Sequence, residues 1–238
     1  YRGQLHLEGL STLDEDVARA LANHSGGLYL NGMKKLESFS AKALAMPENK
    51  SLHLDGLVEL DADTAERLAC YNGDLHLNGI TRLSIKAAES LARYAGNLSL
   101  NGIVSLSPEV ASRLAAHKGI LLLERLESLR VETAAALANH QGHLVLNGLS
   151  TLPLDVASAL VAGDNMLVLN GLSSLSSDLA EILASNTRGL QLDGVTELST
   201  EAADALSHHQ HTIYLGGLLS INAAVAKACL LYTSDAAD

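Results

Sequence analysis

The sequence predicts an α/β fold, a right-handed repeat solenoid with a parallel sheet on its concave side and short helices on its convex side. Three observations lead to this prediction. A Leu-x-Leu pair recurs along the whole chain, the step between pairs is 23 residues with a single step of 24, and a capped, alanine-rich segment follows every pair. A fixed period of this length indicates stacked units of one supersecondary structure. We expect about ten units over residues 1–228, with a right-handed connection between successive strands.

Each unit opens with a short strand that carries the leucine pair. Successive side chains of a strand point to opposite faces, so both leucines point inward and the residue between them points outward. Because helices are wider than strands, the stack should curve with its strands on the inside. The pairs are Leu5/Leu7, Leu28/Leu30, Leu52/Leu54, Leu75/Leu77, Leu98/Leu100, Leu121/Leu123, Leu144/Leu146, Leu167/Leu169, Leu190/Leu192 and Ile213/Leu215.

A corner follows the strand, marked in most units by Asn-Gly or a relative such as Asn101-Gly102. Glycine takes a positive φ readily and asparagine tolerates it, so the pair indicates a tight turn. One unit has Arg125 in place of the glycine. If the corner needs a positive φ, we expect strain of about 1 kcal/mol or more at that residue.

A short helix completes the unit. Alanine recurs at one helix position in all ten units, from Ala18 to Ala226, which indicates a helix packed so closely that only a methyl group fits. Glycines such as Gly96 are expected to turn the chain back just past the helix end. Helix caps are predicted at Asp14, Asp61, Ser84, Ser107, Ser176 and Ser199.

This pattern resembles the leucine-rich repeat family. Units such as Leu91-x-x-x-x-x-x-Leu98-x-Leu100-x-x-Ile103 carry the resemblance, which covers residues 1 to about 228. The family normally has asparagine or cysteine where this chain has Ile103 and its counterparts, whereas here asparagine directly follows the strand. The resemblance implies a scaffold that binds proteins or glycans, usually on the concave sheet.

Both ends of the chain depart from the repeat. It opens with Tyr1-Arg-Gly-Gln, which matches the end of a unit, and Cys229 stands where the last unit should have leucine. Residues 229–238 no longer fit the period. We interpret the chain as a fragment of a longer repeat protein, with both capping units missing and a non-native tail at 229–238. The compartment is left open.

The composition excludes several classes of function. The formal net charge of −11 and the scattered lysines and arginines argue against nucleic acid and against anionic lipid. No apolar run is long enough to cross a bilayer. No nucleophile elbow, phosphate loop or zinc-protease motif occurs, so we expect a protein that is not an enzyme and has no cofactor.

Ten histidines raise the possibility of a metal site. His53 and His76 lie at the same position of adjacent strands, but zinc needs three or four ligands, and we expect no metal. A second set shares one position near the end of the helix and is interpreted as a packing and capping position. Its members are His24, Tyr71, Tyr94, His117, His140 and His209.

The outward strand positions are the candidate binding surface. They begin with four rings, continue with aliphatic side chains and read His6, Tyr29, His53, His76, Ser99, Leu122, Val145, Val168, Gln191 and Tyr214. Exposed apolar patches often mark interaction sites. The predicted contact residues are Tyr29, His53, His76, Leu122, Val145 and Val168.

Three hypotheses of function stay open. The first is a protein-interaction module that binds a protein partner on its concave face. The second is a glycan or small-ligand surface built from Tyr29, His53, His76 and Tyr214. The third is an architectural spacer within a larger scaffold or surface protein.

Overall fold

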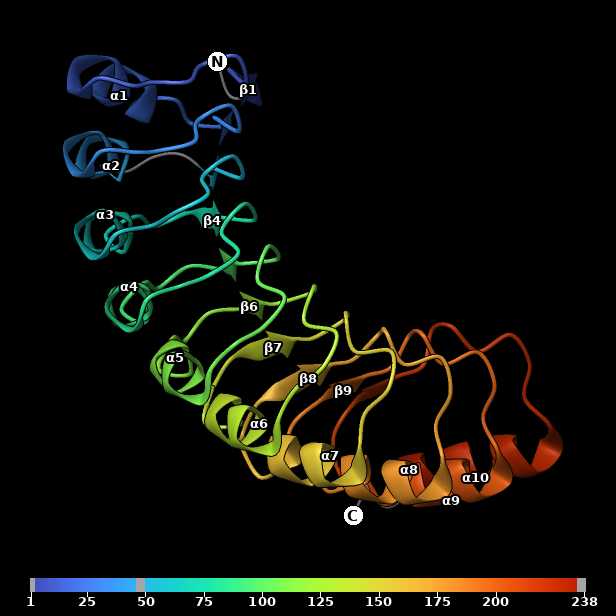
Figure 1. Ribbon diagram of the computed structural model, residues 1–238. Helices are drawn as coiled ribbons and strands as arrows, with labels where there is room; N and C mark the ends of the chain where they lie inside the picture. The colour runs from blue at the N-terminus through green and yellow to red at the C-terminus, as the bar shows by residue number, and fades with distance from the viewer. Residues whose placement is uncertain (1–2, 46–49, 235–238) are drawn as a thin grey trace.

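The protein is described here from a computed structural model, which describes residues 3–45 and 50–234. Ten parallel strands form a single open sheet in the order of the chain, and a helix follows each strand. Figure 1 shows an arc with all strands on its inner side and all helices on its outer side. The leucine-rich-repeat-like α/β solenoid predicted from the sequence is therefore confirmed.

The strands are two or three residues long and pair in register, so that each outward residue stands beside its counterpart in the next unit, as His53 does beside His76. They are β1 Leu5–His6, β2 Gly27–Tyr29, β3 Ser51–His53, β4 Asp74–His76, β5 Leu98–Ser99, β6 Leu121–Leu122, β7 His143–Val145, β8 Met166–Val168, β9 Leu190–Gln191 and β10 Ile213–Tyr214.

The helices span seven or eight residues except for the last, which spans 12. They are α1 Glu15–Ala22, α2 Ser38–Leu44, α3 Ala62–Leu68, α4 Ile85–Leu91, α5 Pro108–Leu114, α6 Val131–Leu137, α7 Leu154–Val161, α8 Ser177–Ala184, α9 Thr200–Leu206 and α10 Ala223–Ser234.

The helices begin where the sequence places their caps. At all six predicted positions the side chain accepts a hydrogen bond from a backbone N–H three residues on, as Ser107 does from Val110. The repeated alanine is fully buried from Ala18 to Ala180. Each helix thus packs directly on the strand layer, and leucine and alanine fill the space between them.

Glycine occurs at the corners for a different reason from the one that the sequence predicts. No described residue has a positive φ, so the predicted left-handed corner is wrong, and the condition for strain at Arg125 is not met. A Cβ on Gly32 would lie 2.0 Å from the carbonyl oxygen of Glu8 in the preceding unit. At the turn after a helix the constraint is similar: a Cβ on Gly96 would lie 2.3 Å from the carbonyl oxygen of Gly73. Glycine is favoured at both turns because adjacent units approach closely, although one unit accommodates Arg125 at its corner.

An asparagine ladder joins successive corners. Among the described residues, an asparagine or aspartate that directly follows a leucine pair accepts a hydrogen bond from the backbone N–H at the same position of the next unit, as Asn78 does from Asn101 at 2.9 Å. This ladder links the units although asparagine is absent from its usual place in the family. Its other described acceptors are Asn31, Asp55, Asn101, Asn147, Asn170 and Asp193.

The C-terminal helix crosses the expected boundary of the repeats. Because α10 runs from Ala223 to Ser234, residues 229–234 continue a helix that begins inside the last unit. Residues 235–238, the last four of the predicted non-native tail, lie outside the described residues. No helix within the described ranges is long and apolar enough to cross a membrane.

Candidate protein-binding face

Four rings form one continuous stack on the concave side. The ring centroids of His6 and Tyr29 are 4.2 Å apart, those of Tyr29 and His53 3.9 Å, and those of His53 and His76 3.9 Å. The planes are within 16° of parallel throughout. We call His6, Tyr29, His53 and His76 the ring stack. The structure therefore brings together three of the six predicted contact residues.

The stack is partly exposed, and the histidine at its centre is uncharged near neutral pH. His6 is exposed, and the other three rings are half-buried. Burial lowers the pKa of His53 to about 4, assisted by the neighbouring His76. His53 is therefore uncharged near neutral pH. The centre of the stack carries no positive charge that would offset nearby carboxylates.

The aliphatic residues in the middle of the face are less accessible than expected. Leu122 is half-buried, but only 8% of Val145 and 7% of Val168 is exposed. The curvature explains this, because side chains on the inner side of an arc converge and cover one another. The expectation of an exposed apolar stripe is wrong for the two valines, which lie side by side on β7 and β8.

Tyr214 does not join the ring stack. It lies on the last strand, six strands away from His76, and 48% of it is exposed. With Met166, Arg188 and Gln210 it lines a shallow hollow of about 470 Å³. The four residues of the glycan hypothesis therefore belong to two separate places on the face.

The other His/Tyr position is internal. Tyr71, Tyr94, His117 and His140 are buried, and the ring centroids of Tyr94, His117 and His140 are 5.8–5.9 Å apart. His117 Nε2 lies 2.9 Å from the carbonyl oxygen of Gly96, and Tyr94 Oη donates to that of Gly73. We call this set the internal column. The packing interpretation holds for it. Tyr94 and His117 bond to the backbone of the preceding unit, whereas the ring nitrogens of His140 have no hydrogen-bond partner among the described residues.

The concave face carries carboxylates that the sequence analysis did not single out. The outward positions before, within and after each leucine pair form three columns, which contain no lysine or arginine. Their acidic members could have been found by comparing aspartate with asparagine at equivalent positions of the repeat. They are Glu8, Asp55, Asp74, Glu124 and Asp193.

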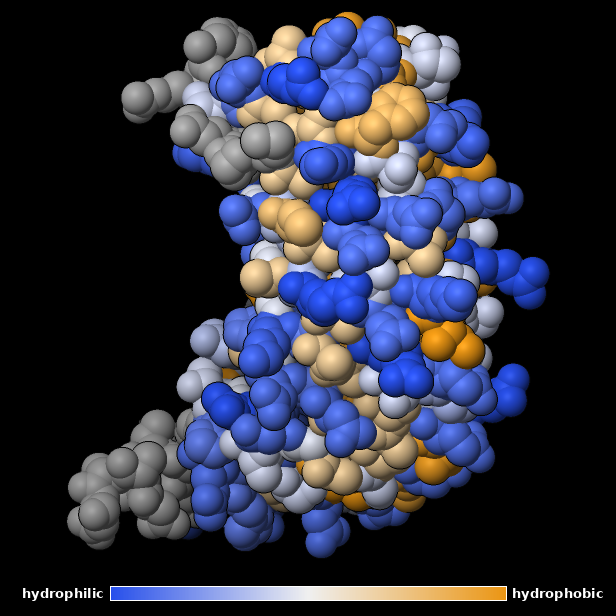
Figure 2. All heavy atoms as spheres, turned by 90° about the vertical axis from the view of Figure 1, so that its left-hand side faces the viewer, coloured by the Kyte–Doolittle hydropathy of each residue, from blue (hydrophilic) through white to orange (hydrophobic). Residues whose placement is uncertain are grey.

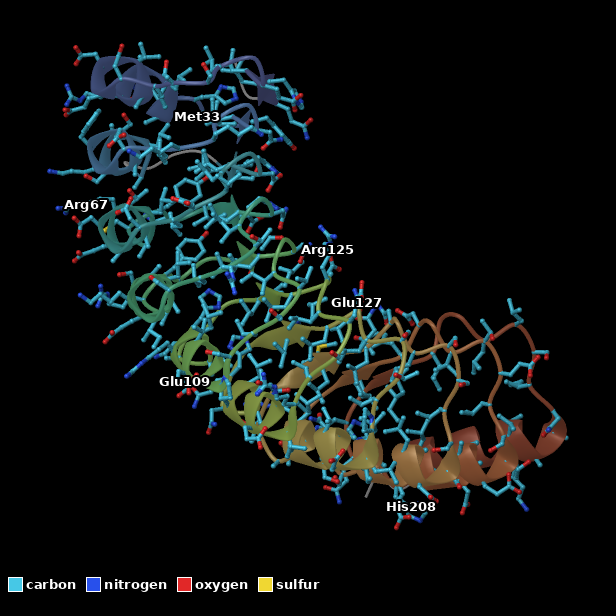
Figure 3. The ribbon with its side chains drawn as sticks, viewed as in Figure 1. Met33, Arg67, Glu109, Arg125, Glu127 and His208 are labelled. Atoms are coloured by element: carbon cyan, nitrogen blue, oxygen red, sulfur yellow. The ribbon has the colours of Figure 1, made fainter. Side chains whose placement is uncertain are left out.

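These carboxylates have few ionic partners. Within the described ranges only histidines lie at ion-pair distance from them: His6 Nδ1 is 3.5 Å from Glu8 Oε1, and His53 Nδ1 is 3.9 Å from Asp55 Oδ2. Figure 3 places Arg67 and Glu109 on the outer, helical side, whereas Arg125 lies on a corner loop. In Figure 2 the face that includes the first helices is mainly hydrophilic.

The described residues of the concave face do not form a metal site or a deep pocket. No group of three His, Cys, Asp or Glu residues in the described part of the chain could hold a metal ion. The described hollows are shallow and open, and the one around Tyr214 has no carboxylate among its lining residues.

Comparisons with known proteins agree on the fold. No protein-family model matches the sequence, and no curated protein does. The structure is similar to that of the leucine-rich repeat-containing protein LegL7 from Legionella pneumophila, with a TM-score of 0.61 and 16% identity over 100% of this chain and 91% of that one. It is also similar to a chain of the Toll–Spatzle complex of Drosophila, with a TM-score of 0.53 and 13% identity over 86% of this chain and 29% of that one.

Proposed function

We propose that this protein is a non-enzymatic module that binds another protein on its concave face, with the ring stack at the centre of the contact. The observation that carries the proposal is the stack itself. Four rings aligned across β1 to β4 give a rigid, amphipathic surface, and aromatic residues are enriched where proteins bind each other. The fold supports it, because leucine-rich-repeat solenoids commonly serve protein interaction, and one similar structure is a chain of the Toll–Spatzle complex.

A structural role alone does not account for the stack. The sheet needs inward leucines and the asparagine ladder, and the outward position tolerates serine, leucine, valine and glutamine in other units. The rings could therefore be replaced without loss of the fold. Their presence in four consecutive units favours a contact surface over the spacer hypothesis.

The test compares two aromatic residues of the same region. Tyr29→Ser removes a ring from the concave face, and Phe39→Ser removes an exposed ring from α2 on the convex face, where 48% of Phe39 is exposed. Partners are captured with the immobilised wild type and identified, and their affinity for each purified variant is then measured. We expect Tyr29→Ser to lower the affinity for a genuine partner at least tenfold and Phe39→Ser to leave that affinity unchanged. Equal affinity of all three proteins would exclude the concave face as the binding surface.

A second candidate concerns the hollow around Tyr214. Its exposed ring stands beside polar side chains such as Gln210, an arrangement that suits a sugar. A glycan array screened with the wild type and with Tyr214→Ser tests this. Hits that disappear with Tyr214→Ser favour a glycan site, and an array without hits counts against it.

A further inference from the structure

The negative charge of Asp55 on the concave face is not required by the fold. Asp55 and Asn78 occupy the same position of the asparagine ladder and make the same bond. Asp55 Oδ1 accepts from the N–H of Asn78 at 2.9 Å, and Asn78 Oδ1 accepts from the N–H of Asn101 at 2.9 Å. A neutral asparagine side chain therefore makes the same ladder bond as Asp55, and that bond does not require the negative charge of Asp55.

The additional charge lies beside the ring stack. Asp55 follows His53 by two residues, and Glu8 follows His6 by two residues. Asp74 precedes His76 by two residues on β4, so the two side chains point to the same side of the sheet. The ring stack is thus bordered by carboxylates on both sides, and no lysine or arginine lies in the three outward columns.

The stack ends in a place that suits a planar cation. The next outward residue is Ser99, which is small and buried and whose hydroxyl donates to Asn78 Oδ1 at 2.7 Å. Among the described residues no fifth ring stacks on His76, and Asp74 stands on the same strand. A guanidinium can stack on an aromatic face and pair with a carboxylate at once, which an ammonium cannot do equally well.

We propose that the concave face of the first four units binds an arginine-rich segment of a protein partner. The charge of this surface selects a cationic partner, and the open end of the ring stack favours arginine over lysine. This inference rests on the proposed function and specifies the chemistry of its partner. Attraction between the carboxylates and the arginines should weaken with salt, because exposed charges are screened.

The test uses a short fluorescent oligoarginine peptide as the probe, with oligolysine and oligoglutamate of equal length, and measures binding by anisotropy at low and at physiological salt. The concave variant is Asp55→Asn with Asp74→Asn. The matched control on α3 is Asp63→Asn with Glu66→Gln, which removes the same charge from the convex face. The Asp55→Asn change keeps the ladder bond, so the thermal midpoint should stay unchanged.

We expect the wild type to bind oligoarginine, to prefer it to oligolysine and to ignore oligoglutamate. Each lost carboxylate should weaken binding about two- to fivefold, as exposed ion pairs do, and the control should bind as the wild type does. Equal losses in both variants would overturn the concave site, and equal affinity for oligolysine would overturn the preference for arginine. No binding of oligoarginine by a protein whose captured partner still depends on Tyr29 would overturn this inference and leave the proposed function standing.

Discussion

Two columns of rings run along this solenoid, and they have the same residue types but different surroundings. The ring stack lies on the concave face with centroids 3.9–4.2 Å apart, closer than the 4.7–4.9 Å typical of adjacent strands. The internal column has centroids 5.8–5.9 Å apart and lies between sheet and helices. The spacing widens from the inside of the arc to the outside, so the curvature itself is visible in the rings.

The comparison separates structure from function. The internal rings are buried, and Tyr94 and His117 also bond to the backbone of the preceding unit, so this column helps to hold the units together. The concave rings touch mainly each other and solvent. A tyrosine or histidine in this chain is therefore structural in one column and available to a partner in the other.

The largest expected difference between the two columns is the loss of stability when one ring is removed from each. Tyr94 is buried and Tyr29 is half-buried. Tyr94→Ala should lower the free energy of unfolding by about 3–5 kcal/mol, the usual loss for a large buried aromatic. Tyr29→Ala should lower it by less than about 1 kcal/mol. Urea unfolding followed by circular dichroism measures both, and similar losses would show that the concave rings are structural too.

Acid should weaken the internal column next. Burial lowers the pKa of His117 to about 4 and also lowers that of His140. Since the unfolded chain, with a histidine pKa near 6.5, takes up protons first, the stability that these groups supply is complete above about pH 6.5 and is lost as the pH falls toward 4. At about 1.4 kcal/mol for each pKa unit, His117 should contribute roughly 3 kcal/mol to this loss.

The control for the acid effect uses a residue that the same position already accepts. His117→Tyr with His140→Tyr replaces two titrating groups by the side chain found at Tyr71 and Tyr94. Thermal midpoints measured from pH 7 to pH 4.5 should fall less steeply in this variant. An unchanged slope would show that other groups control the loss of stability in acid.

The smallest expected effect on stability distinguishes the ladder hydrogen bond of Asp55 from its negative charge. Asp55→Asn should leave the free energy of unfolding within about 0.5 kcal/mol of the wild type, because the ladder bond to the N–H of Asn78 is kept. Asp55→Ala should cost about 1 kcal/mol, because that donor loses its partner. Urea midpoints compare the two variants, and a large loss in Asp55→Asn would mean that the charge itself stabilises the fold.

Most of the fold could be predicted from the sequence because each unit repeats the same local signals ten times. The caps at Asp61 and Ser107, the buried alanines and the register of the strands depend on residues within one unit and its neighbour. The reason for the corner glycines could not be predicted in the same way. A close carbonyl in the preceding unit and a positive φ both favour glycine, and only the three-dimensional path of the chain separates them.

The candidate site was predicted in part for a related reason. The sequence orders Tyr29, His53 and His76 along one face, and the sheet stacks them. It does not report how strongly the arc curves, so the burial of Val145 and Val168 was missed. The concave carboxylates carry no signal within a single unit, because Asp55 occupies a position that asparagine fills in other units.

Amide chemical shifts during a titration with oligoarginine test the central claim most directly. The chain carries many carboxylates on its helices as well as on its sheet, and its net charge of −11 would attract a cationic peptide anywhere. If the concave face is the binding surface, the largest shifts should lie at Tyr29, Asp74 and His76, with small shifts at Asp63 and Glu109. Shifts of equal size at the helix carboxylates, or none on β2 to β4, would contradict the account.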